Sequence, residues 1–135
     1  MNMAGSDTAN PSMGTWLDFK NCDEGNLYSM RFSDYHIGNP LIRSVHGGVT
    51  ASLIEMSAKH TLEKSLENED STIELVSSSV DYLRITKDVD ILARSQIVRI
   101  SRRLAFIDVW CWQDEEKIPI ARGTCTLRIM RHSGN

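Results

Sequence analysis

The sequence predicts an α+β fold in which an antiparallel sheet packs against one long helix. The first observation is a stretch from His46 to about Asn68 that has the length and apolar spacing of a helix and contains no proline. The second is a series of four β-favouring segments that follow this stretch and are separated by short polar turns. Consecutive strands joined by short turns favour antiparallel pairing, and a single helix is then expected to lie across one face of the sheet.

The predicted helix carries apolar side chains on two sides. When Glu55 is placed at zero degrees on a helical wheel, Val49 and Leu53 lie between roughly 100° and 160°. On the other side, Ile54 and Ala58 lie between roughly −40° and −100°. Because both sides need to be buried, we expect protein to cover most of the helix, as it does when a sheet wraps around it.

The expected strands surround this helix in the chain. They are residues 26–36 before the helix and residues 72–86, 89–100, 103–113 and 118–130 after it. A loop that contains Gly38 and Pro40 precedes the helix. A short apolar cluster at residues 16–19 is expected to pack as a helical turn or as an edge.

Length and composition predict one domain. The chain has 135 residues, of which 41% are hydrophobic and 24% are charged, as in an ordinary globular protein. We expect residues 1–14 to form a mobile tail and residues 15–135 to form the domain. No run approaches the roughly 18–20 apolar residues of a membrane span, and the N-terminus has no secretory pattern. Cys22, Cys111 and Cys125 lack C-x-x-C spacing, which favours a reduced, cytoplasmic setting.

The charge of the chain argues against some partners. A net charge of −3 does not favour nucleic acid, although residues 84–135 hold a local surplus of +4. Such a surplus is typical of a solvated sheet face and would also suit a phosphorylated ligand. The four histidines are scattered without the spacing of metal ligands, so no metal site is expected.

The most informative motif lies at the expected start of the helix. A polar loop leads into His46-Gly47-Gly48, and Glu55 follows two turns later. In a first helical turn the backbone N–H groups have no partner within the helix, and Gly48 has no Cβ to keep a substrate away. An acid beside such donors has the parts needed to attack a carbonyl and to stabilise the resulting oxyanion. Simpler interpretations stay open, because Glu55 and Lys59 have the spacing of a surface ion pair and the glycines suit close helix packing.

This motif, in this order of elements, resembles the hotdog fold and, within it, the acyl-CoA thioesterases of the phenylacetyl-CoA thioesterase (PaaI-like) type. The resemblance covers roughly residues 26–131. It rests on His46-Gly47-Gly48 and on three further pieces: Val80-Asp81-Tyr82-Leu83-Arg84, the basic turn Val98-Arg99-Ile100-Ser101-Arg102-Arg103-Leu104-Ala105, and Ile120-Ala121-Arg122-Gly123-Thr124. It implies hydrolysis of an acyl-CoA substrate by a homodimer or homotetramer, with active sites between protomers and no cofactor apart from the coenzyme A of the substrate.

The resemblance also implies roles for single residues. Glu55 matches the catalytic carboxylate of the family, which acts as a general base on water or attacks the thioester directly. Gly48 is expected to donate its N–H to the oxyanion, beside Gly47 in the substrate site. His46 is expected to position the thioester carbonyl, and the acid is expected to face Gly48 and His46 of the other protomer.

The chain departs from the family pattern around the expected site. Asn39 resembles the loop asparagine that orients the nucleophile or water, but it lies seven rather than six positions before the histidine, and Arg43 occupies a usual glycine position. The family often supplies a serine or threonine from the strand after the helix. The aligned position lies near Leu75, and Ser77 on the same strand is the nearest substitute.

Guanidinium groups suit the phosphates of coenzyme A because they form paired hydrogen bonds with phosphate oxygens. The candidates are Arg84, Arg99, Arg102 and Arg103. Solvated turn charges are the simpler interpretation of each.

Two other functions stay open at this point. One is an enoyl-CoA hydratase or dehydratase of the same fold, in which His36 would pair with Glu55. The other is a protein that binds acyl groups or acyl-CoA without turnover, which the apolar Leu75 and the altered loop favour. None of these functions involves nucleic acid or a membrane.

Overall fold

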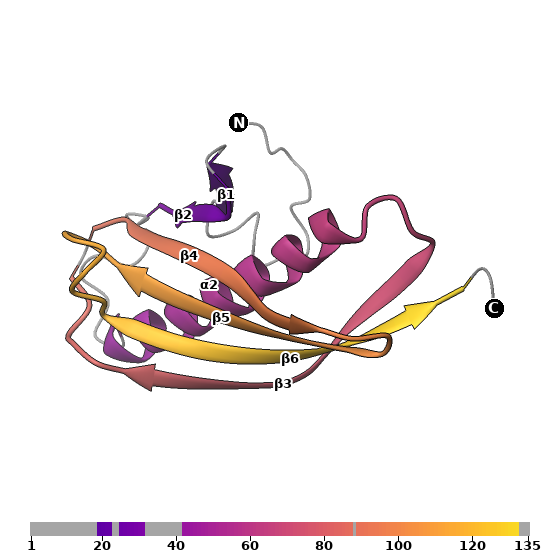
Figure 1. Cartoon of the computed structure of the whole chain (residues 1–135). Helices are drawn as coiled ribbons and strands as arrows, with labels where there is room; N and C mark the ends of the chain where they lie inside the picture. Colours follow the sequence, from indigo (N-terminus) through magenta and orange to yellow (C-terminus); the bar gives the residue numbers. More distant parts are fainter. Residues whose placement is uncertain (1–18, 23–24, 32–41, 88, 133–135) are drawn as a thin grey trace, which may run out of the picture.

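The computed structural model describes residues 19–22, 25–31, 42–87 and 89–132, with the backbone alone for residues 42–47. The described residues form one six-stranded sheet and one long helix (Figure 1). The elements are β1 (Phe19–Cys22), β2 (Leu27–Met30), α2 (Ile42–Ser65), β3 (Ser71–Tyr82), β4 (Ile91–Ile100), β5 (Leu104–Trp112) and β6 (Ala121–Arg131).

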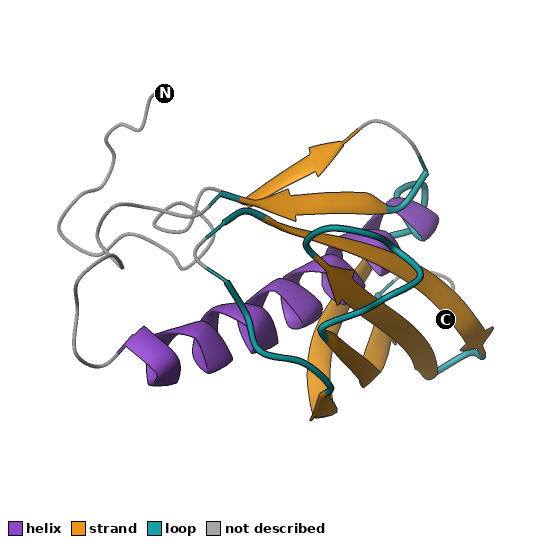
Figure 2. Ribbon diagram, turned by 90° about the vertical axis from the view of Figure 1, so that its left-hand side faces the viewer, coloured by secondary structure: helices purple, strands orange, loops and turns teal. Residues whose placement is uncertain are grey.

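All neighbouring strands of the sheet pair antiparallel in the order β1-β2-β4-β5-β6-β3. Burial alternates along β5 and β6, as expected of strands with one face on a core and one face outside. Figure 2 shows α2 lying against one face of the sheet, and Figure 1 shows the β1–β2 hairpin and β3 on opposite sides of the helix. The predicted α+β class, with an antiparallel sheet around one central helix, is confirmed.

Helix α2 buries the two sides that the helical wheel indicates. Leu53, Ile54 and Ala58 are fully buried, and Val49 and Met56 pack against the same core. Burial of such side chains is the main source of helix stability in a globular protein. The helix therefore forms because the sheet covers it.

The limits of α2 differ from the predicted ones. The helix begins at Ile42, four residues before the expected start at His46, and it ends at Ser65 rather than near Asn68. The prediction that both glycines lie in the first turn is therefore wrong. Pro40 stands two residues before the observed start, and proline is compatible with the entry to a helix.

The strands before the helix also differ from the predicted ones. Of the expected strand 26–36, Leu27–Met30 form β2 and residues 32–36 lie outside the described residues. An additional strand, β1, pairs with β2. Gly25 has a φ of 63°, a left-handed conformation that glycine adopts readily in a tight turn between two strands. The expected tail 1–14 lies outside the described residues, and the boundary at residue 15 stays a prediction.

Two β-bulges bend the sheet around the helix. In β3 the register shifts between Leu75 and Ser77, and in β4 it shifts between Ile97 and Arg99. Because Arg99 pairs with Phe106, Phe106 with Thr126 and Thr126 with Ser77, the two bulges lie on either side of one row of paired residues. Bulges increase local twist and bend the strand that carries them. The sheet consequently bends along a line that crosses four strands.

Gly123 on β6 allows the sheet to approach the helix closely. A Cβ atom at this position would lie 2.8 Å from Cγ2 of Ile54 and 3.0 Å from the carbonyl oxygen of Ser79. Both distances are shorter than ordinary contacts between carbon and its neighbours. The glycine is therefore required where β6 crosses the buried side of α2.

A chain of buried hydroxyl groups joins α2 to β2 and β4. The Tyr28 hydroxyl lies 2.8 Å from Oγ1 of Thr61 and 3.0 Å from Nδ1 of His60. Oγ1 of Thr61 lies 2.6 Å from Oγ of Ser95. Tyr28 is fully buried and its ring stacks on Phe19 at 5.4 Å between ring centroids. Each hydroxyl of this chain can donate one bond and accept another, so the polar atoms satisfy one another within the core.

Candidate active site

Glu55 lies on α2 between the buried side of the helix and its exposed side, and it is half-buried. The Ser78 hydroxyl on β3 donates a hydrogen bond of 2.8 Å to Oε2 of Glu55. This bond fixes the carboxylate against the outermost strand of the sheet. In the described part of the chain no ion pair joins Glu55 to Lys59, so the simpler interpretation of Glu55 as half of a surface ion pair is not what the structure shows.

The bulge in β3 decides which serine reaches Glu55. Before the bulge, Ile73 and Leu75 face the helix, and after it Val80 does. Ser78 shares the face of Val80, whereas Ser77 lies on the other face because successive side chains alternate. Leu75 packs against the core. Ser78 is the serine that lies beside Glu55. Sequence reasoning chose Ser77 because it counted along an unbroken strand.

Cys125 lies near Ser78 and Glu55. It pairs directly with Ser78 across the ladder between β3 and β6 and is fully buried. Burial raises the pKa of the Cys125 thiol to about 12, and the charges of Glu55 and Asp108 act in the same direction. The thiol is therefore neutral at neutral pH and is not a nucleophile.

Because α2 begins at Ile42, Gly48 lies further into the helix than predicted. Gly48 is the seventh residue of α2 and is exposed. In a regular helix the amide of a seventh residue bonds to the carbonyl four residues before it, here Ser44, so it is not one of the unpaired donors of the first turn. Among the described residues, no heavy atom outside the adjoining helix backbone lies within 4 Å of the point where a Cβ would stand. There is consequently open space beside this backbone for another molecule.

The remaining predicted residues of the loop and helix start are only partly described. His46 and Gly47 lie in the second turn of α2, with the backbone alone described. Asn39 and His36 lie outside the described residues, so the structure does not place them beside Glu55.

The four predicted phosphate-binding arginines form two groups. Arg84 lies where its Nη1 donates to the carbonyl oxygen of Pro119, beside the end of β5. Arg99, Arg102 and Arg103 lie at the turn between β4 and β5. The length of β5 separates the two groups by roughly 27 Å, at about 3.4 Å per residue. One phosphate group cannot contact both within a single chain.

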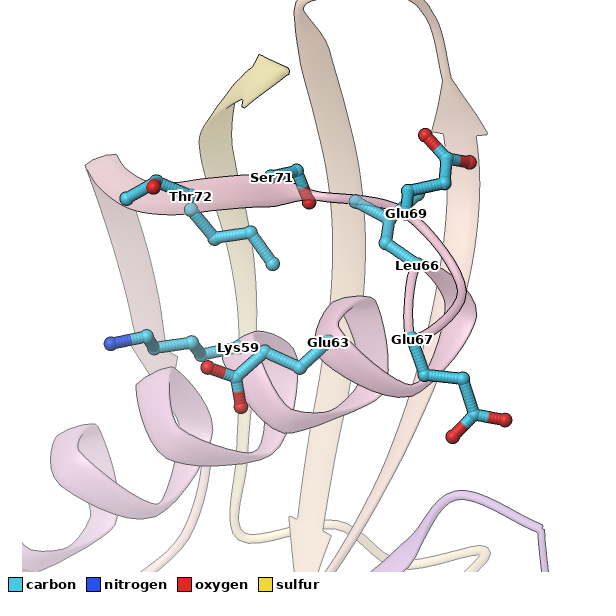
Figure 3. A pocket seen from close by; sticks show the side chains of 8 residues that line it. Lys59, Glu63, Leu66, Glu67, Glu69, Ser71 and Thr72 are labelled. Atoms are coloured by element: carbon cyan, nitrogen blue, oxygen red, sulfur yellow. The ribbon is translucent and has the colours of Figure 1, made fainter. Parts of the chain in front are cut away.

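A hollow of about 390 Å³ lies further along the same side of α2. Lys59 and Glu63 line it from the helix, and Ser71 and Thr72 line it from β3 (Figure 3). It does not include Glu55. Both the hollow and the hydrogen bond between Ser78 and Glu55 thus lie between α2 and β3, with the hollow nearer the end of the helix. Its lining contains three carboxylates, from Glu63, Glu67 and Glu69.

The described residues contain no group of three or more histidine, cysteine or acidic side chains placed to hold a metal ion. No described helix has the length and apolar character needed to cross a membrane.

Comparisons with known proteins place these features in a family. A family model described as the acyl-CoA thioesterase N-terminal domain matches residues 37–128. A proposed esterase from Mycobacterium tuberculosis is similar with a TM-score of 0.75 and 18% identity, over 90% of this chain and 98% of that chain. A search of curated protein sequences finds no significant match.

Two other solved structures are similar over most of the chain. A Bacillus halodurans protein crystallised with CoA has a TM-score of 0.73 and 16% identity, over 87% of this chain and 75% of that chain. A proposed thioesterase from Ralstonia eutropha, described as related to phenylacetic acid degradation, has a TM-score of 0.70 and 17% identity, over 88% and 90% of the two chains. At sequence identities of 16–18%, the similarity of these structures shows the fold alone, which is the hotdog fold. With a family model matched over more than half of its length, the chain belongs to the family of acyl-CoA thioesterase N-terminal domains.

Proposed function

We propose that this chain hydrolyses acyl-CoA thioesters and that Glu55 carries out the reaction. The observation that supports this is the Glu55 carboxylate on the exposed margin of α2, oriented by the 2.8 Å hydrogen bond from Ser78. An acid held in one orientation at an accessible margin suits attack on a bound carbonyl. The acyl-CoA substrate is proposed from the family and from the CoA bound to the similar Bacillus halodurans protein.

Two routes are consistent with this geometry. In the first, Glu55 takes a proton from water while the water oxygen attacks the thioester carbon. In the second, Glu55 attacks the carbon itself and forms an anhydride, which water then opens. In both routes the C–S bond breaks and the CoA sulfur leaves and gains a proton. Single-turnover hydrolysis in H₂¹⁸O distinguishes them, because only opening of an anhydride at the Glu55 carbonyl puts label into the protein.

The proposed oxyanion donor comes from a second copy of the chain. Gly48 stands seven residues before Glu55, which is about 10.5 Å along the helix axis. An oxyanion donor has to lie about 3 Å from the oxygen that it stabilises, so both groups of one chain cannot serve one carbonyl. We therefore propose a homodimer in which Glu55 faces Gly48, with His46, Gly47 and Asn39 of the second copy beside it. To serve in this role, the Gly48 amide has to exchange its helical bond to the Ser44 carbonyl for a bond to the thioester oxygen.

We assign the phosphates of coenzyme A to the turn that carries Arg99, Arg102 and Arg103. The three side chains stand within five residues of one another on an exposed turn. Clustered guanidinium groups bind phosphate oxygens by paired hydrogen bonds. Arg84, at the other end of β5, then serves a separate part of the substrate.

The test is steady-state hydrolysis of a panel of acyl-CoA thioesters followed with a thiol reagent. We expect Glu55→Ala to lower kcat by about 10²–10⁴, the usual range for loss of a general base. We expect Ser78→Ala to lower kcat about tenfold and Ser78→Thr to restore it, because threonine keeps the hydroxyl. Ser77→Ala is the matched control and should leave kcat unchanged, since Ser77 lies on the other face of β3.

Three results would count against this proposal. Wild-type rates from Glu55→Ala on every substrate cleaved would remove Glu55 from the reaction. Loss of enoyl-CoA absorbance without thiol release would point to a hydratase. Tight binding of CoA esters with no product over hours would point to a binding protein without turnover.

A further inference from the structure

Six consecutive exposed residues, 98–103, form the tip of the hairpin between β4 and β5, here called the β4–β5 tip. Figure 1 shows this tip at the end of the sheet away from the start of α2. Two of its side chains are apolar, since Val98 is 59% exposed and Ile100 is 41% exposed. Three others carry guanidinium groups: Arg99, Arg102 and Arg103. The tip therefore combines exposed apolar surface with positive charge.

The bulge in β4 explains why Val98 is exposed. Ile97 pairs with Ile107 and Arg99 pairs with Phe106, so Val98 has no partner on β5. Ile97 packs against the core, whereas the side chain after it does not. Bulges of this kind often redirect a side chain near the end of a strand. The exposure of Val98 is thus a consequence of the register of the sheet.

Hydrogen bonds hold the β4–β5 tip in one conformation. The Ser101 amide donates to the carbonyl oxygen of Leu104 at 2.8 Å, and Oγ of Ser101 accepts from the Leu104 amide at 3.3 Å. From β6, Nε of Arg131 donates to the carbonyl oxygen of Arg102 at 3.1 Å. A fixed turn keeps its guanidinium groups close together, so less conformational entropy is lost when they bind an anionic surface.

The arginines of the tip lack the carboxylate partners that neighbouring arginines have. On β6, Nη1 of Arg128 lies 3.6 Å from Oε1 of Glu74, and Arg131 pairs with Glu69. Within the described part of the chain, the three arginines of the tip form no such ion pair. The tip thus carries a charge of +3 in a chain whose net charge is −3. An anionic surface attracts the tip and repels the chain as a whole, which favours an approach with the tip first.

The size of the tip distinguishes between the possible anionic partners. A stable interface between proteins takes about 20–30 residues a side, and a tip of six residues is too small for one. Nucleic acid is disfavoured by the net charge of −3. A lipid bilayer can accept a small tip, because apolar side chains enter between its headgroups while arginines reach the phosphates at the same depth.

We infer that the β4–β5 tip docks on the surface of an anionic lipid bilayer, with Val98 and Ile100 between the headgroups and the three guanidinium groups on the lipid phosphates.

Binding to vesicles tests this inference with the full chain. One set of vesicles contains phosphatidylcholine alone, and the other contains equal parts of phosphatidylcholine and phosphatidylglycerol. We expect the protein to float with the mixed vesicles and not with the neutral ones. The affinity should fall at least tenfold as the salt concentration rises from about 0.05 to 0.5 M, because salt screens exposed charges.

Substitutions in the tip test the two kinds of contact. Val98→Ser combined with Ile100→Ser should lower the affinity for mixed vesicles about tenfold, because two apolar side chains no longer leave water. Ile85→Ser is the matched control, since Ile85 is 85% exposed between β3 and β4, at the other end of the sheet. Arg102→Ala should lower the affinity about fivefold, and Arg122→Ala, at an exposed arginine near the start of β6, should leave it unchanged. Unchanged urea midpoints would show that the variants fold.

Three results would overturn the inference. The first is equal binding to both sets of vesicles, or binding to neither. The second is wild-type affinity of the variant with serine at both apolar positions of the tip. The third is binding to poly-glutamate without any binding to vesicles, which would assign the tip to an acidic protein instead.

The apolar pair separates this inference from the proposed function, in which the same guanidinium groups bind the phosphates of coenzyme A. The change of Val98 and Ile100 to serine should weaken vesicle binding and leave KM for an acyl-CoA unaltered. Vesicle binding by a protein that hydrolyses no acyl-CoA would keep the inference and remove the function. Hydrolysis by a protein that binds no vesicles would keep the function and remove the inference.

Discussion

At the scale of single residues, the extra residue in the bulge of β3 determines which serine contacts Glu55. The motif that ends at Glu55 is readable in the sequence, because helical spacing from His46 fixes where Glu55 falls on the helix. The bulge at Val76 is not readable, since Leu75, Val76 and Ser77 all suit a regular strand. Ser78 was therefore missed, and the run Ser77-Ser78-Ser79 was the only signal that a hydroxyl lay nearby.

Two glycines should respond oppositely to the same substitution. Gly123→Ala places a methyl group 2.8 Å from Ile54, and overpacking of this kind usually costs about 1–3 kcal/mol of unfolding free energy. Gly48→Ala meets no atom within 4 Å and should stabilise the helix by about 0.5–1 kcal/mol. Urea unfolding of the two variants measures both effects, and a stabilised Gly123→Ala would show that the contact with Ile54 is not tight.

The buried thiols should make stability depend on alkaline pH. Burial raises the pKa of Cys111 and of Cys125 from 9.0 to about 12 in the folded protein. The unfolded thiols ionise from pH 9 upward while the folded thiols stay neutral, so this stability is complete below pH 9 and is lost as pH rises towards 12. For Cys111 the loss at pH 10.5 should be about 2 kcal/mol. Urea midpoints from pH 8 to 10.5 measure it, and a variant with alanine at both positions should show a weaker dependence.

At the scale of elements, the order of the helix and the strands could be predicted from the sequence. The residues at which each element begins and ends could be predicted less well. The spacing of apolar residues predicted the helix and its two buried sides, because apolar residues recur at the positions that are buried. The start at Ile42 was missed because Gly38 and Pro40 indicated a loop that runs up to the histidine. Strand β1 was missed because a four-residue edge strand has too little alternation to distinguish it from a turn.

The hydroxyl chain between α2, β2 and β4 should contribute to stability. Tyr28→Phe removes the group that joins Thr61 to His60 and leaves a buried hydroxyl with one bond fewer. We expect a loss of about 1–3 kcal/mol in unfolding free energy. Tyr28→Phe combined with Thr61→Val should cost less than the sum of the single changes, because both partners are then removed. Additive losses would show that the two hydroxyls do not interact.

At the scale of the whole molecule, fold and family followed from the sequence, whereas the grouping of distant residues did not. The four arginines seemed to be one set because they stand close together in the last half of the chain. The hairpin between β4 and β5 carries three of them away from Arg84 by the length of a strand. Only the folded sheet reveals that separation.

The assignment of the phosphates predicts a difference between two substrates. Arg102→Ala combined with Arg103→Ala should raise KM for an acyl-CoA about tenfold or more, since each lost charged contact weakens binding. The same change should leave the rate with the corresponding N-acetylcysteamine thioester unaltered, because that substrate has no phosphate. Equal effects on both substrates would place these arginines outside the phosphate site.

The two margins of the sheet differ in a way that limits growth. The margin at β3 has 12 residues, whereas the opposite margin, β1, has four described residues. Short terminal strands are one of the ways in which natural proteins avoid open-ended stacking. Open-ended growth of a sheet needs a long strand at both margins, and the described part of this sheet has a long strand at β3 alone.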